Sequence, residues 1–218
     1  MSTATSPHHH DSNEPTHHTL PTSGRALWNV SVSATLHCLT GCAIGEVTGM
    51  AIATALGLGN GASIALAVLL AFVFGYSLTS MPLLRAGLAL GAVVPIALAS
   101  DTFSIATMEL VDNAVVFAVP GAMDAGLGEL LFWGSLSFAL AVAFVVAVPV
   151  NRWLIARGKG HAAVHRTGIH GGPDPRLVGA ALAAAFVFGT AVLVASALAG
   201  DDAGRHVGEA AVLVGATR

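Results

Sequence analysis

The stretch Thr35-Leu-His-Cys-Leu-Thr-Gly-Cys-Ala-Ile-Gly-Glu-Val-Thr-Gly-Met50 places a histidine, two cysteines and a glutamate inside an apolar segment. This segment covers residues 26–56, whereas about 20 apolar residues are enough for a helix to cross a bilayer. Its extra length predicts a tilted helix or a local break. Ionisable side chains are costly inside hydrocarbon and therefore mark functional positions by default. The stretch predicts a membrane-spanning helix that carries a site.

The composition of the chain supports the same class of protein. Of 218 residues, 55% are hydrophobic and only 10% are charged, and the mean hydropathy is +0.77. Globular chains are roughly one quarter charged. The net charge of −3 argues against nucleic acid as a partner, and two cysteines close together do not form a disulfide framework. We expect an all-α, polytopic transmembrane bundle whose main partner is the lipid bilayer.

Four further apolar segments predict four more spans, at about residues 62–84, 101–119, 129–154 and 177–198. The segment 86–100 contains Pro95 and is either a short helix at the membrane face or the first part of a long third span. The predicted organisation is a disordered His-rich tail (1–24), a transmembrane core (25–157), a basic loop (158–176), an additional C-terminal span (177–199) and a short tail (200–218).

Lys and Arg residues orient this bundle. The turn at Asn60 and the loop at Asp124 contain none, whereas the other connections carry Arg25, Arg85, Arg152, Arg157, Lys159, Arg166 and Arg176. Apart from a lone Arg205, the positive-inside rule therefore predicts a multi-pass protein of the plasma (inner) membrane with a cytoplasmic N-terminus. A separate crossing by residues 86–100 would break this pattern. We also expect no cleavable signal peptide, because the first two dozen residues have no apolar core.

Glycines recur every four residues on the first span, at Gly41, Gly45 and Gly49. Such a row lets a second helix approach closely, or it only loosens the helix that carries it. The sequence leaves both interpretations open.

Histidines outside the spans form two groups. The N-terminal tail contains His8, His9, His10, His17 and His18, which either bind divalent metals or are simply solvated. The basic loop contains His161, His165 and His170. Helical spacing would let the first two share a metal, but the surrounding Gly and Pro residues favour a solvated loop beside lipid headgroups.

Helical geometry groups the polar residues of the first span. Cys38, Cys42 and Glu46 fall within about 80° of one another, whereas His37 lies about 100° from Cys38 and faces another neighbour. Thiolates bind copper, zinc or iron, and a cysteine pair can also be a redox couple. Alternatively, both cysteines are small apolar packing residues.

The third span has a matching face. Asp101, Met108 and Asp112 lie on one side of that helix, with Glu109 and Asn113 beside them. An amphipathic helix lying at the interface would instead leave these carboxylates in water. Because the first and third spans start on the same side of the membrane, we expect their polar faces to meet. The predicted metal ligands are Cys38, Cys42, Glu46, Met108, Glu109 and Asp112, with His37 beside them or as a gate.

Several motifs together carry a resemblance. They are His37-Cys38, Gly41-Cys42, Asp101-Thr-Phe-Ser-Ile-Ala-Thr-Met-Glu-Leu-Val-Asp-Asn113, Pro120-Gly-Ala-Met123, Phe132-Trp133 and the run from Pro149 to His161. In this order they resemble the bacterial and archaeal membrane family known as domain of unknown function 4396, over about residues 34–165. The resemblance implies the bundle architecture and supports the choice of site residues, and it implies no reaction.

These observations predict a protein that binds or transports a transition-metal cation, copper or zinc, since soft ligands disfavour magnesium. One alternative is a membrane redox or haem-associated protein that uses Cys38 and Cys42 or His37. A second alternative is a structural scaffold subunit. No Walker motif, Gly-rich nucleotide loop or nucleophile elbow indicates an enzyme. Because five spans are few for a transporter, we expect a homo-oligomer.

Overall fold

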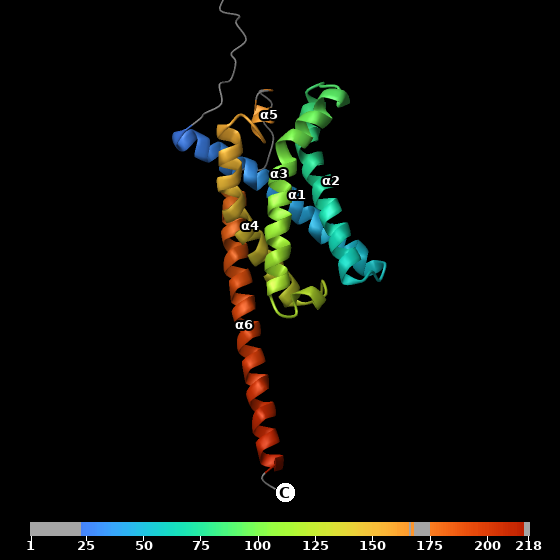
Figure 1. Ribbon diagram of the computed structural model, residues 1–218, viewed down its shortest axis with the longest axis vertical. Coiled ribbons are helices and arrows are strands. Elements are labelled where there is room, and N and C mark those ends of the chain that lie inside the picture. Colours follow the sequence, from blue (N-terminus) through green and yellow to red (C-terminus); the bar gives the residue numbers. More distant parts are fainter. Residues whose placement is uncertain (1–22, 166, 168–174, 216–218) are drawn as a thin grey trace, which may run out of the picture.

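Five long helices make up most of the described chain in this computed structural model, which covers residues 23–165, 167 and 175–215 (Figure 1). They are α1 (Gly24–Ala55), α2 (Asn60–Arg85), α3 (Leu90–Ala118), α4 (Leu130–Ala156) and α6 (Pro175–Gly215); two short helices are η1 (Ala122–Asp124) and α5 (Ala162–His165). Each long helix contains a stretch long and apolar enough to cross a membrane, which in α6 is Gly179–Ala199. The predicted all-α bundle with five spans is confirmed.

Two boundaries differ from those predicted. Helix α3 begins at Leu90, so most of the segment 86–100 is the first part of a long third span. Pro95 is the sixth residue of this helix, so its missing N–H removes one helical hydrogen bond, to the Gly91 carbonyl, close to the helix start. Helix α6 continues to Gly215, so most of the predicted short tail is helical. The predicted disordered tail with its five histidines lies outside the described residues, as does His170.

The glycine row of α1 packs directly on the backbone of α2. A Cβ atom added at Gly41 would lie 2.6 Å from Gly75 Cα, and one at Gly49 would lie 2.5 Å from Ala67 Cα. One at Gly45 would lie closer still to the backbone of Ala71. The close-approach interpretation of this row is therefore confirmed, and such contacts are how helices associate where lipid surrounds them.

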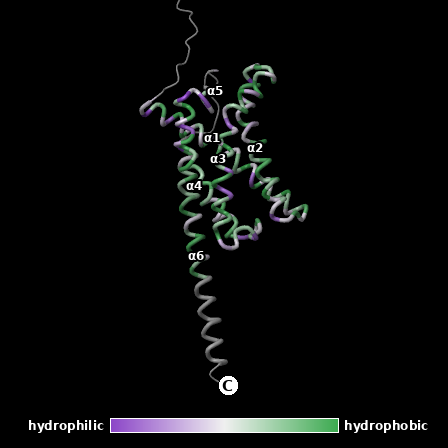
Figure 2. Tube along the Cα trace, in the orientation of Figure 1, coloured by the Kyte–Doolittle hydropathy of each residue, from purple (hydrophilic) through white to green (hydrophobic). Residues whose placement is uncertain are grey.

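Helix α3 is polar on its inner face and apolar on its outer face. Asp101, Ser104 and Asp112 are buried, whereas Phe103 and Leu110 are 60% and 73% exposed. A water-soluble helix shows the opposite arrangement. This inversion agrees with a helix that faces lipid, and it excludes the interfacial helix whose carboxylates face water. Figure 2 shows hydrophobic residues along the helices and hydrophilic residues gathered around α5.

The connection after α4 returns the chain to the bundle. Gly158 and Gly160 have φ values of +69° and +61°, which other residues rarely adopt. A Cβ atom added at Gly160 would lie 3.6 Å from the carbonyl oxygen of Ser100, so this loop packs against α3. The turn therefore brings His161 beside the buried polar part of α3.

Candidate metal centre

Three side chains from three segments converge near the α5 end of the bundle. They are Cys38 of α1, Asp101 of α3 and His161 of the loop before α5, and their candidate ligand atoms all lie within 4.8 Å of one another. Asp101 Oδ1 is 3.0 Å from His161 Nδ1 and 3.8 Å from Cys38 Sγ. Cys38 and Asp101 are fully buried, and only 11% of the His161 side chain is exposed. We call this group the Cys-Asp-His centre.

Buried hydroxyl and amide groups hold this centre in place. Ser100 donates a hydrogen bond of 2.9 Å to Asp101 Oδ1. Asn151 of α4 donates through Nδ2 to Thr35 Oγ1 at 2.8 Å and to Ser104 Oγ at 2.9 Å. Ser104 in turn lies beside the Cys38 thiol. The network therefore connects α4 to both helices that carry the centre.

His37 lies next to the centre but is oriented toward α2. Its Nε2 is 3.1 Å from Thr79 Oγ1, as expected for a residue that faces a different neighbour from Cys38. Its ring centroid is 5.6 Å from that of His161. The buried Nδ1 of His37 has no hydrogen-bond partner among the described residues. That nitrogen is consequently a further candidate metal ligand, on a ring that lies next to the centre.

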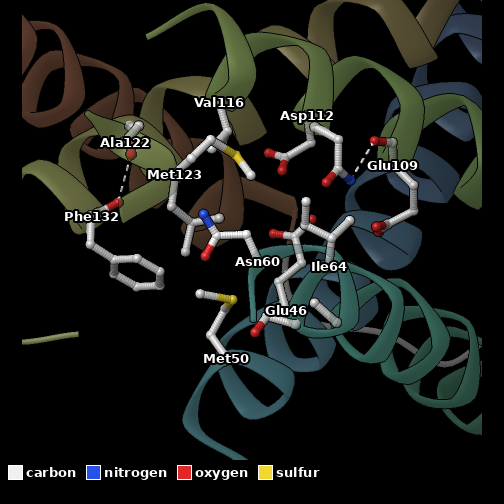
Figure 3. Close-up of a pocket in the computed structure, with 15 residues that line it drawn as sticks. Glu46, Met50, Asn60, Ile64, Glu109, Asp112, Val116, Ala122, Met123 and Phe132 are labelled. Carbon is white, nitrogen blue, oxygen red and sulfur yellow. Dashed lines mark hydrogen bonds between the residues drawn. The ribbon is translucent and has the colours of Figure 1, made fainter. Parts of the chain in front are cut away.

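A second group of acidic residues lies toward the opposite end of the bundle. Glu46 of α1 and Glu109 and Asp112 of α3 line a cavity of about 80 Å³ (Figure 3). All three are at least 94% buried. The polar residues Asn60, Ser63, Asn113 and Ser135 also line this cavity, together with Met50 and Met123. We call this cavity the carboxyl chamber.

Cys42 and Met108 lie between the two groups along α1 and α3. Both are buried in an apolar cluster with Ile105 and Ala71, and Cys42 faces Glu109 across the α1–α3 contact. The polar faces of α1 and α3 do meet, as the helical geometry predicts. However, Cys38 and Glu46 are eight residues apart, about 12 Å along the helix. The predicted ligands therefore divide between two groups instead of forming one site.

Two members of the centre were not among the predicted ligands. Asp101 belongs to the acidic face predicted on the third span. It was predicted at the start of that span, whereas it lies well inside α3, which begins at Leu90. His161 was expected in a solvated loop, and the left-handed turn at Gly158 and Gly160 places it inside. The only signal for this position was the presence of His161 in the family motif. The side chain of His165 lies outside what the structure describes.

Fold and polar interior together define a polytopic helical membrane protein with ionisable residues inside its bundle. Residues 27–160 match the family described as "Domain of unknown function (DUF4396)". Since this match covers more than half of the chain, the protein belongs to that family, as the sequence motifs indicated. The match contains every acidic residue of the centre and the chamber, and it ends one residue before His161. No curated protein and no solved structure matches the chain.

Proposed function

We propose that this membrane protein binds a transition-metal cation, zinc or copper, at Cys38, Asp101 and His161, as the binding step of its transport. The proposal rests mainly on the convergence of the three ligand atoms within 4.8 Å. Metal–ligand bonds of 2.0–2.3 Å in a tetrahedral zinc site place neighbouring ligand atoms about 3.3–3.8 Å apart. Two of the three separations in the centre are 3.0 and 3.8 Å, close to that range, and the third is at most 4.8 Å.

The donor types support the same class of cation. A thiolate and an imidazole select zinc or copper over magnesium or calcium. A Cys38 thiolate and an Asp101 carboxylate together carry two negative charges, which a divalent cation would neutralise. Burying such charges without a cation is costly. His37 supplies an additional nitrogen beside the centre.

The side of the membrane follows from the basic residues. Three basic residues closely precede His161 in the sequence, namely Arg152, Arg157 and Lys159. By the positive-inside rule, the His161 end of the bundle faces the cytoplasm and the protein lies in the plasma membrane. The centre would then exchange its cation with the cytoplasm. The redox alternative has less support, because Cys38 lies against Asp101 whereas Cys42 faces Glu109. The haem alternative has less support because His37 Nε2 lies 3.1 Å from Thr79 Oγ1.

Metal titration of the full chain in lipid nanodiscs tests the proposal. After removal of bound metal by a chelator, the wild-type protein should bind one more equivalent of Zn²⁺ or Cu⁺ than Cys38→Ser, Asp101→Asn or His161→Ala. The His-rich tail contributes equally to all of them. Co²⁺ bound in place of Zn²⁺ should show a sulfur-to-cobalt charge-transfer band that Cys38→Ser removes.

Cys42→Ser is the matched control, since this cysteine is equally buried on the same helix but lies outside the centre. It should retain the full stoichiometry and the charge-transfer band. Equal binding by the wild type and all three centre variants would refute the proposal, as would a loss in Cys42→Ser as large as that in Cys38→Ser.

A further inference from the structure

We propose that the carboxyl chamber is a second cation site, which takes a hydrated divalent cation such as Mn²⁺, Mg²⁺ or Ca²⁺ through oxygen ligands. This site is separate from the Cys-Asp-His centre and does not depend on it. Its members come from the same two helices but lie about 12–17 Å further along them. They are Glu46, Glu109 and Asp112, and no thiol or imidazole lines the cavity among the described residues.

Most carboxyl oxygens in the chamber have no hydrogen-bond partner of ordinary geometry among the described residues. Both carboxyl oxygens of Glu46, both of Glu109 and Oδ1 of Asp112 are buried without a hydrogen-bond partner among the described residues. Glu46 interacts electrostatically with Asp112 and, to a smaller extent, with Glu109. Ionised carboxyl groups only accept hydrogen bonds, so these three cannot satisfy one another in that form. Buried polar groups in proteins normally have partners, which points to a ligand inside the chamber.

The space fits such a ligand. A cavity of about 80 Å³ holds several water molecules, since one water occupies roughly 10–15 Å³ on this measure. Figure 3 shows Glu46 on one side of the cavity and Asp112 and Glu109 on the other, so a cation between them would contact both helices. Mg²⁺ and Mn²⁺ are commonly held by a few carboxylates together with retained waters, and Ca²⁺ takes six to eight oxygens.

The neighbouring amides agree with oxygen coordination. Asn113 donates through its Nδ2 to the backbone carbonyl of Glu109 at 2.8 Å, which leaves its amide oxygen as an additional acceptor for a cation. Asn60 donates to the exposed Asp124 at 3.1 Å and thereby links α2 to η1 beside the chamber. An exposed carboxylate at this end would attract cations toward the chamber from the side opposite His161.

Mn²⁺ binding, followed by electron paramagnetic resonance, tests this site on the full chain in nanodiscs of zwitterionic phosphatidylcholine. The wild-type protein should bind one Mn²⁺, and Mg²⁺ or Ca²⁺ should compete for it. Glu46→Gln and Asp112→Asn should each weaken binding by about 10-fold or more. Glu129→Gln changes an exposed glutamate at the same end of the bundle and should leave Mn²⁺ binding unchanged.

Cys38→Ser should also leave Mn²⁺ binding unchanged, so a failure at the Cys-Asp-His centre can be told apart from a failure at the chamber. Zn²⁺ binding by Glu46→Gln and Asp112→Asn reports whether these variants are folded. Bound Mn²⁺ should show no nitrogen coupling from imidazole in pulsed measurements. Such a coupling, an absence of bound Mn²⁺, or equal binding by the wild type and the Glu46→Gln/Asp112→Asn double variant would each overturn the proposal.

Discussion

The Cys-Asp-His centre and the carboxyl chamber are built on the same two helices but treat their acidic groups differently. At the centre, Asp101 Oδ1 receives a hydrogen bond from Ser100 and lies 3.0 Å from His161, while only its Oδ2 has no partner among the described residues. In the chamber, neither oxygen of Glu46 has a donor among the described residues. The centre is therefore held in position by the protein itself, whereas the chamber depends on protons or a cation. Equal burial of an acidic residue does not imply an equal role.

The largest effect is expected for a substitution that disrupts the Cys-Asp-His centre and the carboxyl chamber together. Gly45→Leu would place a side chain against the backbone of Ala71, where even a Cβ atom has no room. We expect the α1–α2 contact to fail and both Zn²⁺ and Mn²⁺ binding to be lost. Detergent size-exclusion chromatography and both metal titrations check this result. Gly59→Leu, at an open position in the turn between the same helices, is the control that should retain both.

The second-largest effect should reduce metal binding at the Cys-Asp-His centre and leave the carboxyl chamber unchanged. Asn151→Ala removes the donor that connects α4 to Thr35 and Ser104. Loss of such a supporting group typically weakens metal binding about 10–100-fold, so Zn²⁺ affinity should fall by that factor. Mn²⁺ affinity should stay within about twofold of the wild type, because Asn151 does not line the chamber. A parallel loss of both affinities would mean that Asn151 supports the whole bundle.

A smaller effect concerns stability in the absence of any cation. Glu46→Met replaces a buried carboxyl group without donors by an apolar side chain of similar length, which should raise the free energy of unfolding by about 1–2 kcal/mol. Asp101→Leu removes a carboxyl group that has partners and should lower it by about 1–3 kcal/mol. Thermal unfolding with chelator present measures both. A shift in the same direction for both variants would remove the distinction drawn between the two regions.

The smallest expected effect tests how far the centre extends. Thr79→Val keeps the side-chain shape but removes the hydroxyl 3.1 Å from His37 Nε2. A hydrogen bond contributes about 0.5–1.5 kcal/mol, so Zn²⁺ affinity should change about 2–10-fold if His37 assists the centre. Competition with a chromophoric chelator resolves such a change. Thr40→Val is the control, since Thr40 bonds only to the Leu36 carbonyl of its own helix.

Hydrophobic run length was sufficient to predict the five spans, and helical angles were sufficient to predict that the polar faces of α1 and α3 meet. Shared helical angle was given more weight than the rise of about 1.5 Å per residue, so Cys38 and Glu46 were assigned to one site although they lie two helical turns apart. His161 could not be placed, because its position depends on two left-handed glycines that turn the chain back toward Ser100. The extension of α3 through Pro95 was left open because a proline beyond the first helical turn removes a hydrogen bond and commonly ends or kinks a helix.

The glycine row leaves α1 without side chains where it meets α2, and this limits how the two helices can move. Backbones in direct contact leave little room for relative movement, so we expect α1 and α2 to move together. His37 and Cys38 belong to that pair of helices, whereas Asp101 and His161 belong to α3 and the loop after α4. A rocking motion that breaks the hydrogen bond from Asn151 to Thr35 would pull Cys38 away from Asp101 and open the coordination shell. Changing access to the site and releasing its cation would then be a single movement.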